Sequence, residues 1–188
     1  LPLEGPYVVY ENSTINDASG NGNMQLDYNE AVSIALGLKN VGTDDVSDIE
    51  VSISSTDEFI VLSDATETYP LIEAGQTVAV ADGFAFSVSN DVPDGHSILF
   101  DYTAVSGDNQ WTGSFTIVAH SVVLNFAGTQ VSDEQGNNNG KADPGETFQL
   151  QLSVLNAGTA PGYNLTGQLT SDDPYVIINV DSLNYGTI

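Results

Sequence analysis

Large apolar and small or polar side chains alternate along much of this chain. Every second residue from 32 to 38 is a large aliphatic one, and residues 148–154 repeat the alternation. A period of two predicts strands with one buried face. The same criterion predicts strands over residues 48–53, 58–62, 77–88, 96–104, 110–118, 164–169 and 175–180. No window has a 3.6-residue apolar stripe, so we expect an all-β protein.

Turn-forming residues separate these runs. They stand at 40–42, 74–75, 93–95, 106–109 and 156–158; all five segments contain Gly, and four of them also contain Asn, Asp or Pro. Roughly seven short strands in about 110 residues are typical of an Ig-like or fibronectin-III-like β-sandwich. The pattern therefore predicts sandwiches in tandem.

The chain contains an internal repeat. A shift of 116 residues aligns 7–72 with 123–188 without a gap and gives 14 identities in 66 positions. We therefore predict an Ig-like repeat over 1–120 and a second, incomplete one over 121–188, which lacks the equivalent of 73–119. On this reading the chain is a fragment of a longer protein. We expect the open edges of the second repeat to be disordered or paired with another chain.

The strongly negative net charge of the chain limits the classes of molecule that it can bind. The 188 residues include 26 Asp and Glu but only two basic residues, Lys39 and Lys141, which gives a net charge of −24. Such a chain repels phosphate backbones and anionic membrane surfaces, so nucleic acid is an unsuitable partner. No apolar run is long enough to span a bilayer, and no membrane insertion is expected. With so few basic residues, divalent cations are the natural neutralising partners of clustered carboxylates.

Two acidic loops, 17–30 and 133–146, carry the most informative residues. Calcium prefers six to eight oxygen ligands held in a tightly wound loop. From its third position onward the second loop matches the ligand spacing of a twelve-residue EF-hand loop, with Gly140 at the sharp turn. The first loop has Met24 at that turn, so its match is poorer. The predicted Ca²⁺ ligands are Asp133, Asn137, Asn139, the Lys141 backbone carbonyl, Asp143 and Glu146, and Asp17, Asn21, Asn23, the Gln25 backbone carbonyl, Asp27 and Glu30.

An alternative explanation is that these loops are turns in which Asp and Asn cap their own backbone. That accounts for the glycines and for some of the asparagines. It does not account for the Asp and Glu that recur 10 and 13 residues after the first Asp in both copies.

These loops and the segments after them resemble a known repeat family. The segments that carry the resemblance are 133–146, 155–159 and 171–176 and, in the first copy, 92–96 and 111–115. The family is the Ig-like, CARDB-related β-sandwich module of secreted bacterial proteins, often found downstream of gingipain-like cysteine peptidase domains. The resemblance implies an extracellular or outer-surface location, after removal of a signal peptide that the N-terminal residues do not contain.

The resemblance also implies a function. It suggests a non-catalytic spacer, stalk or interaction module whose partners are other domains of the parent chain, a surface protein or a glycan. An adhesin or a carbohydrate-binding module is the alternative, with Trp111 and the tyrosines as candidate sugar platforms.

The inventory of reactive side chains argues against an enzyme. The chain has no Cys and no Arg, and its two histidines are His96 and His120. His96 begins a strand and is expected to be a packed or edge residue. Trp111 is in phase with apolar residues, which favours a place in the core. We therefore expect no catalytic residues in this chain.

Overall fold

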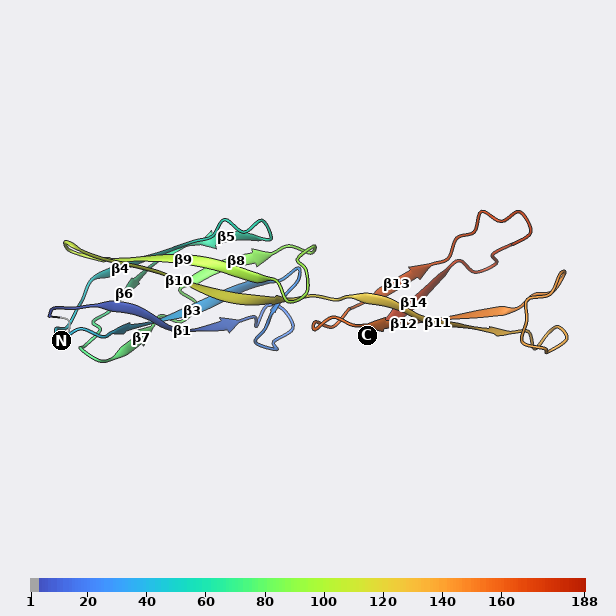
Figure 1. The fold of residues 1–188 in the computed structure, drawn as a ribbon, viewed down its shortest axis with the longest axis horizontal. Helices are drawn as coiled ribbons and strands as arrows, with labels where there is room; N and C mark the ends of the chain where they lie inside the picture. The colour runs from blue at the N-terminus through green and yellow to red at the C-terminus, as the bar shows by residue number, and fades with distance from the viewer. Residues whose placement is uncertain (1–3) are drawn as a thin grey trace. The chain divides into compact units, whose positions relative to one another are not determined.

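The computed structural model describes residues 4–188; the N-terminal residues 1–3 of the predicted first repeat lie outside the described residues. The chain divides into two compact units, Leu1–Ser121 and Val122–Ile188. This division lies one residue from the predicted repeat boundary. All regular elements of the described chain are strands (Figure 1). Among residues 4–188 the structure has no helix with the length and hydropathy needed to span a bilayer.

The first unit is a complete β-sandwich. One sheet has the order β1-β3-β8-β5, with β7 also paired to β3, and the other has the order β2-β10-β9-β4-β6. The strands are β1 (Val8–Asn16), β2 (Leu26–Asp27), β3 (Ala31–Asn40), β4 (Ile49–Ser54), β5 (Ile60–Asp64), β6 (Thr66–Tyr69), β7 (Thr77–Ala79), β8 (Phe84–Val88), β9 (Ser97–Ser106) and β10 (Asn109–His120).

The inward-facing residues of both sheets form one core. Strand β4 shows the alternation most clearly, since its residues are in turn buried and exposed from Ile49 to Ser54. The Phe86 and Phe100 rings lie 5.1 Å apart between centroids, and Phe100 stacks on Phe115 at the same separation. Trp111 is buried in this core. The structure thus confirms the all-β sandwich fold.

The second unit contains four strands in two separate two-stranded sheets. Strand β11 (Leu124–Ser132) pairs with β12 (Gln149–Asn156), and β13 (Leu165–Gln168) pairs with β14 (Ser182–Gly186). The β11–β12 register repeats the β1–β3 register at the 116-residue offset, bulge included: Val8 faces Asn40, and Leu124 faces Asn156. The unit therefore has the fold of about half a sandwich.

Two predicted strands differ from the structure. The run 77–88 is two strands, because the backbone between β7 and β8 turns at Asp82, where φ is 55°. The segment 175–180 is not a strand. Its equivalent in the first unit, β5, forms its ladder with β8. The second unit has no counterpart of β8 within residues 122–188, so the backbone of 175–180 has no strand to pair with.

Candidate calcium-binding loops

The two acidic loops occupy equivalent places in the two units. Loop 17–30 connects β1 to β3, and loop 133–146 lies between β11 and β12. The first loop is fastened to its own sandwich by β2, which runs parallel to β10 with Leu26 opposite Ala119 and Asp27 opposite His120. The Tyr28 N–H extends this pairing by donating to the His120 carbonyl at 2.9 Å. The second unit contains no counterpart of β10 among residues 122–188, so loop 133–146 lacks this attachment.

Both loops follow the same backbone path. Positive φ angles occur at equivalent positions, 64° at Met24 and 75° at Gly140, and again 58° at Asn29 and 82° at Gly145. The turn that the EF-hand comparison assigns to glycine is therefore left-handed in both copies. The sequence departure at Met24 leaves the path unchanged, at the cost of a strained conformation for a residue with a Cβ atom.

The first aspartate of each loop is a buried anchor. Asp17 is 2% exposed and Asp133 is 1% exposed. The Asp17 carboxylate accepts the backbone N–H groups of Asn23 at 2.8 Å and Met24 at 3.2 Å. In the second loop, Asp133 accepts from Asn139 at 2.9 Å and Gly140 at 3.1 Å. These bonds wind the loop around one carboxylate, which places the remaining polar side chains close together.

A second aspartate receives two side-chain amides in each loop. Asn21 and Asn23 donate through Nδ2 to Asp27 Oδ2 at 2.5 and 2.9 Å. In the second loop Asn137 and Asn139 donate to Asp143 Oδ2 at 2.8 and 2.7 Å. These two amides hold the pKa of Asp143 below its ordinary value, because they stabilise the ionised carboxylate.

The glutamate that ends each loop folds back over its start. Glu30 Oε1 accepts the Asn21 N–H at 3.1 Å, and Glu146 Oε1 accepts the Asn137 N–H at 3.1 Å. Burial raises the pKa of Glu30; hydrogen bonds from the Asn21 and Asp27 backbone oppose the rise, and the charges of Asp27 and Asp17 add to it. Partial burial is thus the main reason that the neutral form of Glu30 is favoured more than in water.

Glycine leaves room for the glutamate where it crosses the chain. A Cβ atom on Gly20 would lie 2.8 Å from Glu30 Cδ, and one on Gly136 would lie 2.7 Å from Glu146 Cδ. Both distances are too short for a real contact, so the close approach of carboxylate and backbone explains why both copies have Gly here.

One carboxylate oxygen in each loop is buried without a hydrogen-bond partner. Among residues 4–188 the buried side-chain oxygen and nitrogen atoms in this condition are Asp27 Oδ1 and Glu146 Oε2. Asp27 as a whole is 2% exposed. A buried anionic oxygen without a donor is costly, and a hard cation is the partner that would satisfy it. The residues present therefore fit a calcium ion.

The structure brings some of the predicted calcium ligands together by their side chains and others only by their place in the turn. The structure brings together the side chains of the Asp, Asn and Glu residues predicted in each loop. Gln25 and Lys141 lie in the same turns, where their N–H groups donate to Asn23 Oδ1 at 2.7 Å and Asn139 Oδ1 at 2.8 Å. In the described chain no three His, Cys, Asp or Glu side chains form a metal centre by themselves. Any site in these loops thus depends on amide and backbone oxygens as well as carboxylates.

The two histidines have structural partners. His96 Nε2 lies 2.7 Å from Asp57 Oδ2, and the His96 ring meets Phe59 edge to face. This contact joins the β4–β5 and β8–β9 connections, which the sequence pattern did not indicate. His120 lies at the end of β10 opposite Asp27.

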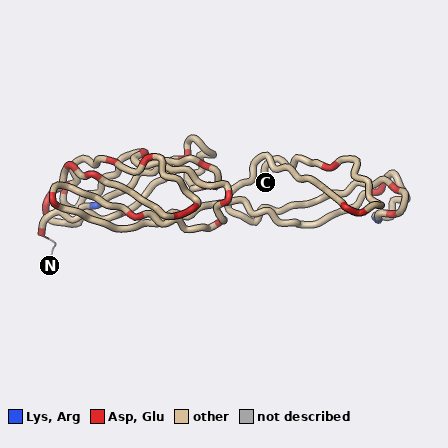
Figure 2. The backbone as a smooth tube through the Cα atoms, turned by 90° about the horizontal axis from the view of Figure 1, so that it is seen from above, with Lys and Arg blue, Asp and Glu red and all other residues tan. Residues whose placement is uncertain are grey.

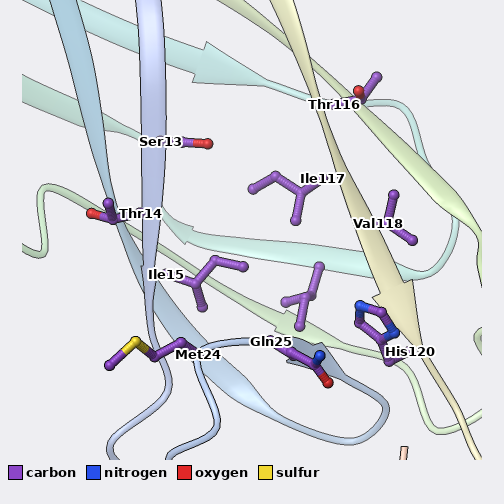
Figure 3. A pocket seen from close by; sticks show the side chains of 10 residues that line it. Ser13, Thr14, Ile15, Met24, Gln25, Thr116, Ile117, Val118 and His120 are labelled. Atoms are coloured by element: carbon purple, nitrogen blue, oxygen red, sulfur yellow. The ribbon is translucent and has the colours of Figure 1, made fainter. Parts of the chain in front are cut away.

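An open groove of about 470 Å³ lies beside the first loop (Figure 3). It is bounded by residues 13–15 of β1, residues 24–26 and residues 116–118 and 120 of β10. No aromatic ring other than the His120 imidazole lines it, and Trp111 is in the core. The groove therefore lacks the stacking platform expected of a sugar site.

No protein-family model and no curated protein matches the chain. One similar solved structure is the pre-assembly complex of the CsuC chaperone and the CsuE tip adhesion subunit from the archaic chaperone–usher Csu pili of Acinetobacter baumannii. The identity is 16%, the match covers 72% of this chain and 85% of that chain, and the TM-score is 0.27.

Proposed function

We propose that this chain is a non-catalytic, calcium-stabilised extracellular module that acts as a spacer or interaction segment of a larger secreted or surface bacterial protein. The parent protein would belong to the class of the Ig-like, CARDB-related repeats, gingipain-like peptidases included. The observation that carries the calcium part is the pair of donorless buried oxygens, Asp27 Oδ1 and Glu146 Oε2, one in each predicted loop.

Charge supports the same proposal. The chain has a net charge of −24, and each loop gathers two aspartates and a glutamate around asparagine amides. Calcium would neutralise part of this charge and replace hydrogen bonds that now hold Asp27 and Asp143. The residues that would hold the ion are the Asp, Asn and Glu side chains of each loop. The ion supplies charge and coordination, and no chemical reaction is involved.

The structure also suggests that the two sites differ in affinity. Loop 17–30 is fastened to β10 through β2 and contains the buried Asp27, whereas Asp143 is half-buried. A preorganised loop binds with a smaller ordering cost. The first loop should therefore bind more tightly, although the second fits the EF-hand spacing better. Extracellular modules bind calcium with Kd values on the order of 10⁻⁴–10⁻³ M.

Calorimetric melts in 10 mM calcium and in chelator test the proposal. A ligand at about 100 times its Kd adds about 2.7 kcal/mol of stability, so Tm should rise by several degrees. Titration calorimetry should find two ions per chain, and Asp27→Asn and Glu146→Gln should each remove one. Asp101→Asn, an exposed β9 residue outside both loops, is the matched control. Identical melts with calcium and with chelator would refute the calcium proposal.

A further inference from the structure

The chain contains two Asn-Gly sequences, and each lies in one of the acidic loops. They are Asn21–Gly22 and Asn139–Gly140, which are not at equivalent positions of the repeat. Asparagine is one of the thermolabile residues of proteins. A following glycine makes it more reactive, because no Cβ atom hinders the approach of the backbone to the side chain. Each loop thus has one asparagine of this reactive kind, at a different place in the turn.

The reaction in question is deamidation, and it uses only the chain and water. The backbone nitrogen of the glycine attacks Cγ of the asparagine, and a new N–Cγ bond forms as the Cγ–Nδ2 bond breaks. The side-chain amide leaves as ammonia, with the proton that the glycine N–H has lost. Water then opens the succinimide ring at either of its two C–N bonds to Cγ or to the backbone carbonyl, which gives isoaspartate or aspartate. Because the nucleophile is the deprotonated glycine nitrogen, the surroundings of that N–H control the rate.

The side chains of the two asparagines are held in the same way. Asn21 Oδ1 accepts the Asn23 N–H at 3.0 Å, and Asn139 Oδ1 accepts the Lys141 N–H at 2.8 Å. Each Nδ2 donates to the second aspartate of its own loop. Both side-chain carbonyls are therefore turned back toward the backbone that follows them. The two asparagines thus differ little at the carbon that is attacked.

The two glycine N–H groups differ in their surroundings. Gly140 N–H donates to Asp133 Oδ1 at 3.1 Å, and Asp133 is 1% exposed. A buried carboxylate in this position opposes loss of the Gly140 proton, because an anionic nitrogen would then lie beside an anionic oxygen. Gly22 N–H has no acceptor among residues 4–188. Gly22 is exposed, and a Cβ atom on it would meet nothing within 4 Å, so water reaches its nitrogen.

We propose that Asn21 is a site of spontaneous deamidation in the folded chain, and that the bond from Gly140 to Asp133 protects Asn139 from the same reaction. Loop 17–30 thus gains a carboxylate as the protein ages, at a residue that is one of its predicted calcium ligands. Loop 133–146 keeps its asparagine. The chemistry depends on the Gly22 N–H and on water, and it does not depend on calcium.

Deamidation changes the electrostatics of the first loop. Asn21 Nδ2 donates to Asp27 Oδ2 at 2.5 Å, and the product has an anionic oxygen in place of this donor. The loop has three carboxylates and no basic residue, whereas the second loop contains Lys141. Figure 2 accordingly shows a blue segment beside red ones at one end of the second unit. A fourth carboxylate therefore increases the need of the first loop for a cation, a consequence that rests on the proposed calcium binding.

Peptide mapping by mass spectrometry tests the proposal on the unaltered chain. The chain is incubated without calcium at mildly alkaline pH, either native or unfolded in guanidinium chloride, and aspartate plus isoaspartate is measured at both asparagines. In guanidinium chloride the two Asn-Gly sequences should react at similar rates, because neither glycine N–H is then held. In the native chain Asn21 should react at least about tenfold faster than Asn139, which corresponds to about 1.4 kcal/mol in the barrier.

The second loop supplies a matched variant. It has Asn138 at the position equivalent to Gly22, and both are left-handed, with φ of 56° and 73°. Gly22→Asn therefore suits the turn and should slow the reaction of Asn21 at least about tenfold, while Asn139 keeps its rate. Circular dichroism checks that the variant folds. The proposal is overturned if native Asn21 does not react faster than Asn139, or if Gly22→Asn leaves the rate at Asn21 unchanged.

Asn21→Asp reproduces the aspartate product and tests its consequence for calcium. In chelator the Tm of this variant should be lower than that of the unaltered chain, and calcium should raise it by more. An equal or smaller rise would overturn the increased need for a cation. Identical melts in calcium and in chelator for both chains would refute calcium binding itself, whereas the rates at Asn21 and Asn139 are measured without calcium and decide the deamidation separately.

Discussion

The Tyr69 hydroxyl donates a hydrogen bond of 2.6 Å to the backbone carbonyl of Leu36 in the opposite layer of the first sandwich. Tyr69 is buried, and this burial raises its pKa, with a smaller contribution from the charge of Glu67. The bond therefore joins β6 of one sheet to β3 of the other across the core. Its counterpart, from Tyr185 to the Leu152 carbonyl, is longer at 3.2 Å.

Replacing these tyrosines should affect the two units unequally. Tyr69→Phe leaves a buried carbonyl without its donor, and we expect a loss of about 1–2 kcal/mol from the free energy of unfolding of the first unit. Tyr185→Phe should cost less, because Tyr185 is half-buried and water can replace the bond. Urea melts of both variants measure the difference. Equal losses would contradict the different burial of the two hydroxyls.

Asn40 is a second buried polar residue that joins separate segments of the first unit, and its substitution should cost more stability than that of Tyr69. Its side chain accepts the N–H groups of Tyr7 and Gly42 and donates to the carbonyls of Asp44 and Ile72. Asn40→Ala removes all four hydrogen bonds, although the Ile72 carbonyl still accepts the Val46 N–H at 3.1 Å. We therefore expect a loss of about 3 kcal/mol or more. Asn40→Asp is the informative companion, because it keeps the acceptor but cannot donate. Chemical denaturation should find the unaltered chain most stable, Asn40→Asp next and Asn40→Ala least stable, whereas equal stability of the two variants would contradict a contribution from the accepted bonds.

The sequence predicts the local features of this fold well. The alternation after residue 30 locates β3 and β12, and the repeat offset locates the two acidic loops and their shared turns. Those features depend on residues that are close in sequence, or on the alternation of apolar and polar residues that a strand with one buried face requires. The buried state of Trp111 follows from the same reasoning.

Features that depend on a distant partner were not predictable in this way. Residues 175–180 have strand composition, yet they form no strand without a neighbour. The parallel pairing of Leu26–Asp27 with the end of β10 joins residues more than 90 positions apart, and it includes the buried Asp27. The spacing of the ligands in the sequence therefore favoured the second loop as the better calcium site. The burial of Asp27 and the attachment of the first loop to β10 favour the first loop instead.

The contact between Asp57 and His96 predicts a pH dependence of stability. Burial of Asp57 favours its neutral form, but the Phe59 N–H and the His96 ring outweigh this and hold its pKa below the ordinary value of 3.8. A carboxyl whose pKa is lower in the folded state than in the unfolded state stabilises the folded protein at pH values above its ordinary pKa. That contribution to stability is lost as the pH falls through the folded-state pKa. Asp57→Asn should thus cost about 1 kcal/mol at neutral pH. The cost should shrink below pH 3.8, as urea melts over a pH series can determine, with Asp101→Asn as control.

The crossing of Glu30 over Gly20 predicts that a side chain at position 20 displaces the Glu30 carboxylate. Gly20→Ala adds a Cβ atom 2.8 Å from Glu30 Cδ and must displace the carboxylate. We expect about a tenfold loss of calcium affinity in the first loop, or about 1.4 kcal/mol. Gly136→Ala should do the same in the second loop. Titration calorimetry on the two variants should locate each loss in its own site, and an Ala18→Gly variant controls for changes elsewhere in the loop.

Met24 offers a test of strain that is separate from metal binding. Its φ of 64° is left-handed, and its side chain is 77% exposed, so the residue gains little packing in return. Met24→Gly should remove the strain, which stabilises the folded state, but it also gives the unfolded chain more conformational freedom, which offsets part of that gain. We expect the free energy of unfolding to rise by up to about 1 kcal/mol. Gly140→Met should impose the opposite change on the second loop. Denaturation in chelator measures both effects without calcium, and calcium affinity should stay nearly constant because no predicted ligand atom changes. A loss of stability in Met24→Gly would show that the left-handed turn of the first loop is not strained.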